Sequence, residues 1–319
     1  MKMSAVGLQV SETVIAFMLM VLAAYFLKKK GLLKQEDGPM FSRLLTQAVL
    51  PATIFYELWT HPLSGATIIP VLIMLVSGVV SLAGTWLVGV LLKFDRQNTG
   101  ALMIISSFGS SALIGYPIIQ YAFSHNPQAL AEGIIISELG VGLPIFILCP
   151  FVAMYFGGTL KSGRDVGKLA KDYFLSPIFM AVVLGLVCSR LDIPAGTLLV
   201  DTIMATLKMT QGALVVVSAV ILGLQLTFQA PRGFWMLIIV SIMVQMVLQP
   251  WFCDAIAARL QVIVEHRQIL VLLSALPAAI LGPVFAARYD CAAKTATLLT
   301  FTHIAVSPVV VPVVFAFFT

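Results

Sequence analysis

The chain has 319 residues, of which 60% are hydrophobic and only 10% are charged, whereas soluble domains carry about 25% charged residues. This composition excludes an ordinary soluble domain and indicates an all-α membrane protein with several spans. The formal net charge of +5 is therefore interpreted by where Lys and Arg fall between the spans, and it does not indicate nucleic-acid binding.

Ten apolar segments approach or exceed the roughly 20 residues that a membrane-spanning helix needs. In chain order these expected spans 1 to 10 are Leu8–Leu27, Pro39–Leu58, Thr67–Leu92, Gly100–Phe123, Gly133–Phe156, Tyr173–Leu191, Thr197–Phe228, Gly233–Ala258, Ile269–Ala287 and Ala296–Phe318. In the first segment the positively charged residues come after the apolar run and not before it, and no signal-peptide cleavage site stands out. We therefore expect a retained span and not a signal peptide.

Span 4 is interrupted in its middle. Residues 106–117 read SSFGSSALIGYP and contain two glycines, several hydroxyls and a proline. Glycine and proline free backbone groups from the helical ladder, and hydrocarbon cannot satisfy them. Such a break survives only inside protein or beside a water-filled cavity. The segment therefore predicts a binding site.

The interruption has a counterpart in the second half of the chain. Adding 167 to each number carries Ser110 to Pro277, Ile114 to Leu281 and Gly115 to Gly282, so residues 276–283 (LPAAILGP) form a second interrupted segment. Two such segments at matching places are typical of secondary transporters with internal repeats. The same offset maps spans 1 to 5 onto spans 6 to 10. Because five is odd, the second repeat is expected to be inverted.

The distribution of charge orients the chain. We expect a first repeat at 1–157, a cytoplasmic connector at 158–172 and a second, inverted repeat at 173–319, with both termini outside an integral plasma membrane protein (the inner membrane in bacteria). With this orientation the inner face collects Lys28, Lys29, Lys30, Lys34, Arg43, Lys93, Arg96, Lys161, Arg164, Lys168, Lys171, Arg232, Arg288 and Lys294. Only Lys2, Arg190, Arg259 and Arg267 remain outside, with Lys208 within span 7.

Three motifs resemble the auxin efflux carrier family. They are GSSALIGYP from Gly109, ALP from Ala275 with VFAARY from Val284, and LPA from Leu50. The family belongs to the bile acid/auxin transporter superfamily and includes plant auxin exporters and bacterial carriers for malonate, malate and similar anions. The resemblance covers essentially the whole chain. Because a long central hydrophilic loop is absent, the chain resembles the compact prokaryotic type.

The resemblance implies ten transmembrane helices in two inverted five-helix repeats, with spans 4 and 9 broken and crossing. It implies a scaffold of spans 1, 2, 6 and 7, often paired in a homodimer, and a moving transport domain of spans 3–5 and 8–10. The family commonly has Asn where this chain has Ser110, and plant members place proline at Gly109. A hydroxyl thus replaces an amide that both donates and accepts hydrogen bonds.

The two breaks supply the predicted substrate site. Half-helix N-termini carry unpaired N–H groups and a positive dipole end, which suit a carboxylate. Hydroxyls of the first break and peptide groups of the second would bind it, although simple kinks for helix packing are the alternative. The predicted substrate-binding residues are Gly109, Ser110, Ser111, Tyr116, Leu276, Pro277 and Ala278.

Three ionisable residues inside spans are candidates for coupling or for a counter-charge, because charge within a membrane is costly. Glu138 can titrate in a proton-coupled cycle, or it can be an interfacial carboxylate. Lys208 can face an anion, or it can extend outward along the helix face that it shares with Asp201. His303 can relay protons or make an interhelical hydrogen bond. Glu57 and His61, at the outer edge of span 2, are expected to be solvated.

The resulting hypothesis is a secondary carrier of a small organic anion, first a dicarboxylate such as malonate or malate, working by elevator-type alternating access among membrane lipid. Alternatives are a ligand-gated channel or sensor that uses the same pocket, and a sodium-coupled symporter of the bile-acid type. The sequence has no HExxH, GxSxG or Walker-type motif, and its four cysteines have no CxxC spacing. We therefore expect no enzyme, no metal site and no cofactor.

Overall fold

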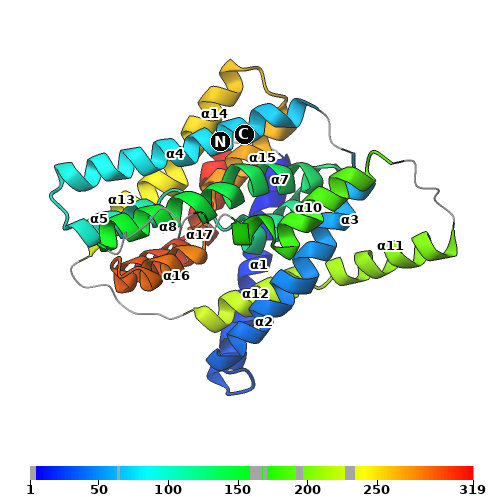
Figure 1. The fold of residues 1–319 in the computed structure, drawn as a ribbon, viewed down its shortest axis with the longest axis horizontal. Coiled ribbons are helices and arrows are strands. Elements are labelled where there is room, and N and C mark those ends of the chain that lie inside the picture. Colours follow the sequence, from blue (N-terminus) through cyan, green and yellow to red (C-terminus); the bar gives the residue numbers. More distant parts are fainter. Residues whose placement is uncertain are drawn as a thin grey trace.

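The structure is a computed structural model that describes residues 5–62, 65–158, 167, 171–191, 197–226 and 234–318. Helices form almost all of its regular structure (Figure 1). Within these described residues, six helical stretches are long and apolar enough to cross a membrane, namely Val6–Lys29, Gly65–Leu91, Ala129–Gly157, Leu198–Gln225, Trp235–Arg259 and Ala293–Phe318. They coincide with expected spans 1, 3, 5, 7, 8 and 10. The prediction of an all-α polytopic membrane protein is confirmed.

The helices follow one another closely along the chain. Those of the first half are α1 (Ala5–Lys29), α2 (Gly38–Leu44), α3 (Leu50–Thr60), α4 (Ile68–Leu91), α5 (Arg96–Ile105), α6 (Tyr116–Ala122), α7 (Ala129–Ser137) and α8 (Leu143–Gly157). Those of the second half are α10 (Pro177–Cys188), α11 (Leu198–Gln211), α12 (Leu214–Gln225), α13 (Trp235–Ile242), α14 (Gln249–Arg259), α15 (Val264–Ala275), α16 (Leu281–Arg288) and α17 (Ala293–Phe318).

Expected spans 2, 4, 6 and 9 are built from shorter helices. Span 2 is divided into α2 and α3, span 4 into α5 and α6, and span 9 into α15 and α16, while α10 of span 6 has 12 residues. The expected connector 158–172, with Lys161, Arg164 and Lys168, lies mostly outside the described residues.

In the part of the chain that the structure describes, four π-helical turns widen the helices ahead of prolines. The turns are η2 (Leu45–Val49), η4 (Ser111–Gly115), η5 (Glu138–Gly142) and η6 (Met243–Leu248). The second residue after each turn is a proline, at 51, 117, 144 and 250. A proline ring has no N–H to donate and clashes with the carbonyl four residues earlier, and a π-helical turn makes room for it.

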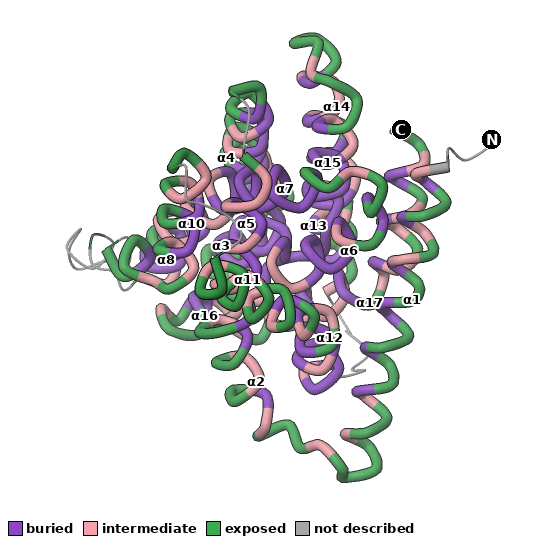
Figure 2. The backbone as a smooth tube through the Cα atoms, turned by 90° about the vertical axis from the view of Figure 1, so that its right-hand side faces the viewer, coloured by how far each residue is buried: buried purple, intermediate pink, exposed green. Residues whose placement is uncertain are grey.

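The helices that lie deepest are α5, α7 and α15. Every residue of α7 is buried, as are Thr99–Ile105 of α5 and Ile269–Ala275 of α15 (Figure 2). Other helices pack outside them, with α1 packed on α12 and α17, and α3 packed on α10 and α11. A helix that is apolar on all sides must be enclosed by other helices.

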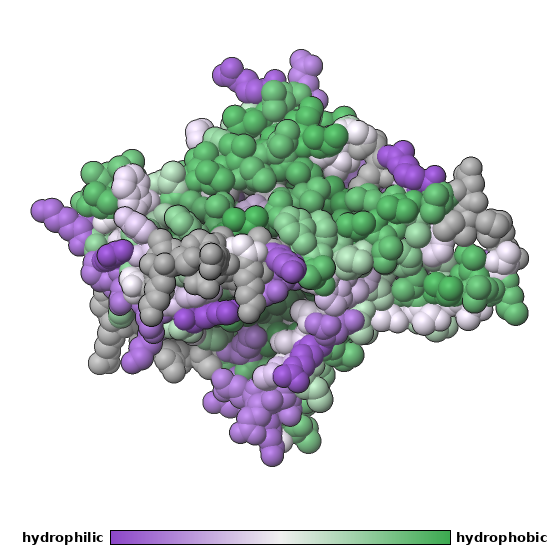
Figure 3. All heavy atoms as spheres, in the orientation of Figure 1, coloured by the Kyte–Doolittle hydropathy of each residue, from purple (hydrophilic) through white to green (hydrophobic). Residues whose placement is uncertain are grey.

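The outer surface is apolar over most of the face in Figure 3, with hydrophilic residues gathered toward the ends of the molecule. Exposed side chains on this surface include Leu91, Leu198 and Phe317. Apolar exposure on this scale fits contact with lipid. The two termini lie close together in Figure 1, where α1 begins and α17 ends.

Candidate functional site

The two breaks meet in the interior. Helix α5 ends at Ile105 and the helix resumes at Ser111, while α15 ends at Ala275 and α16 begins at Leu281. The intervening segments run antiparallel, with a bridge between Gly109 and Ala278. The Ser110 N–H donates to the Pro277 carbonyl at 2.8 Å, and the Ala279 N–H donates to the Phe108 carbonyl at 2.9 Å. Each break thus satisfies part of the backbone that the other leaves free.

Local sequence explains why the chain leaves the helix at these points. A residue that precedes proline is pushed out of the α region, and Leu276, before Pro277, is extended at ψ 150°. Gly109 permits the close approach of the two segments. A Cβ added there would lie 3.1 Å from both the Leu273 carbonyl oxygen and the Leu276 Cβ.

Two buried glutamines of span 8 satisfy carbonyls that the breaks expose. The Gln249 Nε2 donates to the Ser107 carbonyl at 3.2 Å and to the Ser77 Oγ at 3.1 Å. The Gln245 Nε2 donates to the Leu276 carbonyl at 3.4 Å. Sequence analysis missed both residues. Two amides one helical turn apart in an apolar span were the available signal.

A cavity of about 350 Å³, which we call the central cavity, adjoins the crossing. Residues from η2, η4 and η5 line it, so three of the four π-helical turns face it, as is frequent at functional sites. The lining residues are Ser42, Leu45, Thr46, Gln47, Leu50, Gly109, Ser110, Ser111, Ala112, Leu113, Ser137, Glu138, Val141, Gly142, Ile145, Phe146, Tyr173, Ser176, Pro177, Ile178, Ile221, Gln225, Ala279, Ile280 and Leu281.

Among the described residues that line the cavity, Glu138 is the only Asp, Glu, Lys or Arg. It is buried, and its carboxylate accepts hydrogen bonds from the Tyr116 hydroxyl at 2.7 Å and the Tyr173 hydroxyl at 3.2 Å. The Tyr173 hydroxyl also donates to the Glu138 carbonyl at 2.9 Å. Next to it, the Ser137 hydroxyl bonds to the Ser111 hydroxyl. The carboxylate therefore links helices of spans 4 and 5 to the segment before α10.

The structure brings the predicted substrate residues together, but not all of them line the cavity. Gly109, Ser110 and Ser111 do, whereas Tyr116 lies behind the wall and holds Glu138. Leu276, Pro277 and Ala278 are buried behind the crossing, and residues 279–281 line the cavity in their place. The breaks begin after Ile105 and after Ala275, an offset of 170 residues, whereas the sequence match used 167.

Two of the ionisable candidates lie away from the central cavity. Lys208 lines a second cavity, described below. His303 is fully buried in α17, and its Nε2 lies 3.0 Å from the Ser241 hydroxyl. The expectation that Glu57 is solvated is wrong, because α11 covers it and it is only 6% exposed. No group of His, Cys, Asp and Glu in the described part of the chain could hold a metal ion.

Buried, crossed helix breaks beside a cavity, within a polytopic helical membrane protein, define the class of membrane transporters. The chain matches the profile of the family described as "Membrane transport protein" over residues 9–158 and 164–314 and belongs to this family, that of the auxin efflux carriers. It is a transporter and not an enzyme.

Two archaeal proteins are similar to the chain. An "uncharacterized transporter" of Methanothermobacter thermautotrophicus is 27% identical over 225 residues, which cover 70% of each chain. An "uncharacterized transporter" of Methanocaldococcus jannaschii is 24% identical over 284 residues, which cover 88% of this chain and 89% of that protein.

Proposed function

We propose that this protein is a secondary carrier that moves a small organic anion through the central cavity, with dicarboxylates such as malonate or malate as first candidates. The observation that carries the proposal is the position of the cavity against the two crossed breaks. In membrane proteins irregular backbone is retained where it lines a site or is buried in protein.

The chemistry of the cavity suits a carboxylate. Two helices begin at its wall, at Ser111 and at Leu281, and the first N–H groups of a helix have no partner within it. Hydroxyl and amide groups line the same cavity, from Ser110, Gln47 and Gln225 among others. Apolar side chains form the rest of the lining and would contact a short carbon skeleton.

Repulsion between Glu138 and a bound carboxylate implies that a proton binds together with the anion. Among the described residues the lining includes no Lys, Arg or His, so an ionised Glu138 would repel a carboxylate bound in the cavity. Protonation of Glu138 removes that repulsion and leaves a hydroxyl that can donate to the substrate. We therefore include coupling of anion to proton movement in the proposal, with Glu138 as the proton-binding residue.

The division of the lining supports movement between two bodies. The lining residues come from spans 2, 6 and 7 and from spans 4, 5 and 9. We assign the first set to the expected scaffold and the second set to the expected transport domain of two inverted repeats at 1–157 and 173–319. With both termini outside, the lining residues of η2, the start of α10 and the end of α12 lie toward the cytoplasm. The proposed cycle then begins from a cavity directed inward.

Counterflow in liposomes tests the proposal. Liposomes loaded with unlabelled anion should accumulate labelled malonate, malate or a monocarboxylate from outside, because a carrier exchanges its substrate and an open channel does not. Glu138→Gln should retain exchange but lose accumulation driven by a pH gradient. Glu36→Gln, an exposed acid outside the cavity, is the matched control and should behave as wild type. If folded protein exchanges no carboxylate, the anion proposal is wrong.

A further inference from the structure

A second cavity of about 350 Å³ lies at the other end of the same helices. The central cavity adjoins the turns η2 and η4, whereas this second cavity adjoins the ends of α3 and α6 and the turn that leads to α7. Helix α11 closes it on one side. Its lining residues are Tyr56, Glu57, His61, Ile119, Gln120, Phe123, Ser124, Asn126, Pro127, Leu130, Lys208 and Gln211.

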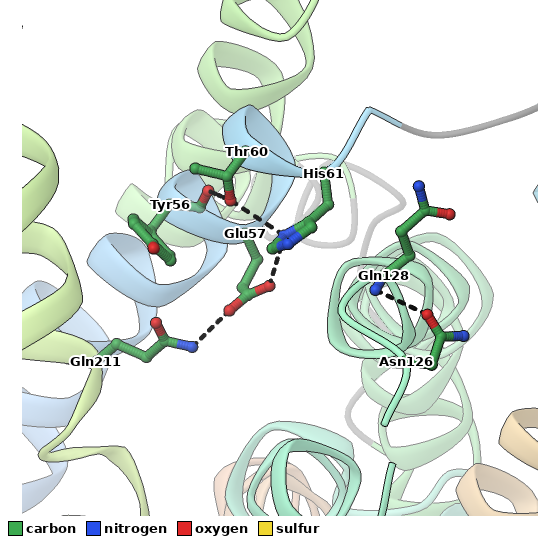
Figure 4. Close-up of polar contacts among 7 residues, drawn as sticks. All are labelled: Tyr56, Glu57, Thr60, His61, Asn126, Gln128 and Gln211. Atoms are coloured by element: carbon green, nitrogen blue, oxygen red, sulfur yellow. Dashed lines mark hydrogen bonds and ion pairs between the residues drawn. The ribbon is translucent and has the colours of Figure 1, made fainter. Parts of the chain in front are cut away.

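A pair formed by Glu57, which is buried, and His61, whose side chain is 24% exposed, forms the wall of this second cavity on α3. The His61 Nδ1 lies 3.1 Å from the Glu57 Oε2 and 3.0 Å from the Thr60 hydroxyl, and the Gln211 Nε2 donates to the Glu57 Oε1 at 2.6 Å (Figure 4). Both carboxylate oxygens are thus engaged. The hydrogen bond to Glu57 raises the pKa of His61 above its usual 6.5, so the ring carries its charge over a wider pH range.

The remaining polar groups around the second cavity are mostly free donors. Because Nδ1 of His61 is turned to Glu57, the Nε2 is left for the cavity, and neither it nor the Lys208 ammonium has a partner among the described residues. The hydroxyls of Tyr56 and Ser124 line the cavity as well. Gln120 contributes an amide whose buried Oε1 has no partner in the described part of the chain. With Glu57 paired to His61, Lys208 leaves the lining with a net positive charge.

We propose that the second cavity is a carboxylate-binding site in which Lys208 and His61 hold the anion and Glu57 orients His61. The choice of a carboxylate rests on the proposed function. The two cavities then have different roles, because in the described part of the chain the central cavity is lined by no Lys, Arg or His, whereas the second is lined by Lys208 and His61. An anion that approaches from the His61 face meets the positive site first, which raises its local concentration beside the scaffold helices.

A purely structural role for the two cations makes a different prediction. Lys208 lies in the last turn of α11, and His61 follows the last residue of α3. Cations at helix C-termini stabilise the helix dipole without any ligand. The binding site is therefore tested by ligand affinity, with the thermal stability of the unliganded protein measured beside it.

Equilibrium dialysis of labelled malonate against the purified full-length protein, at low salt and pH 6, measures both sites. The wild-type protein should bind malonate at two classes of site. Lys208→Gln should raise the Kd of one class on the order of 5-fold or more, and Ser110→Ala should affect only the other. Lys208→Arg should retain binding. Lys294→Gln removes an exposed lysine that lines neither cavity and should change nothing.

The outcomes separate this inference from the proposed function. Malonate binding that is unchanged in Lys208→Gln overturns the second site, and a loss of thermal stability without a loss of binding assigns Lys208 to the helix end alone. Suppose that malonate binding depends on Lys208 but not on Ser110, and that no counterflow is seen. This result supports the second site and contradicts the carrier. Counterflow without any binding that depends on Lys208 supports the carrier and overturns the second site.

Discussion

The crossing of the two breaks depends on the missing side chain at residue 109. In Gly109→Ala the added Cβ would lie 3.1 Å from the Leu273 carbonyl oxygen and from the Leu276 Cβ. The first atom belongs to the last turn of α15 and the second to the break that follows it, so relief would stretch the two backbone hydrogen bonds of 2.8 and 2.9 Å. Overpacking of this kind lowers the free energy of unfolding by about 1–3 kcal/mol. Alanine also restricts the unfolded chain more than glycine does, which raises the free energy of unfolding by about 0.4–1 kcal/mol. We expect a net loss of about 1–2 kcal/mol.

Unfolding of the detergent-purified variant by heat or denaturant measures this loss, and counterflow measures its effect on transport. The control is Gly84→Ala on α4, where the new Cβ would meet nothing within 4 Å. In a helix interior this change should stabilise the protein by about 0.5–1 kcal/mol. Equal stability and transport for Gly109→Ala and wild type would refute the close-approach argument.

Further variants test other parts of the account. Ser110→Ala removes a neutral hydrogen bond of about 1 kcal/mol, so the malonate concentration for half-maximal counterflow should rise about 5-fold. Gly157→Ala places a Cβ 1.9 Å from the Tyr289 carbonyl oxygen, so its thermal midpoint and yield should fall far more than those of Gly84→Ala. The raised pKa of His61 predicts a stabilisation by Glu57 that is present below pH 6.5 and is lost as the pH rises through the raised value. Thermal midpoints against pH should show this slope in wild type and not in His61→Gln.

Hydropathy and the two interrupted segments predicted the helical class and the place of the crossing. Proline and glycine in an apolar span carry that information locally, because proline removes a backbone N–H and glycine permits conformations outside the helix. Their grouping at the two breaks is what distinguishes these segments, since α8 continues through Pro150 and α17 through Pro308. The register of the crossing was not predictable in the same way. Pro277 ends α15 at Ala275, whereas no proline lies near the end of α5 and its break is centred on Gly109. The offset of 167 residues found by matching residue types therefore differs from the offset of 170 residues between the ends of α5 and α15.

Polar residues within the fold were harder to predict, because their partners lie far away in the chain. Glu57 was expected to be solvated from its place at a span end, yet Gln211, on another helix, covers and bonds it. Gln245 and Gln249 lie one helical turn apart in an apolar span, but their importance depends on carbonyls freed by two distant breaks. Sequence patterns give the break itself, and only the packed structure gives the groups that satisfy it.

Accessibility of the central cavity from the two membrane faces tests the central claim most directly. Ala112 lines this cavity and is partly exposed, so Ala112→Cys in a background with Cys188→Ser provides a thiol for a membrane-impermeant reagent. The account predicts labelling from each face in turn and slower labelling when malonate or another exchanged anion is bound. Labelling from one face only, at a rate that no substrate gradient changes, would contradict alternating access at the crossing.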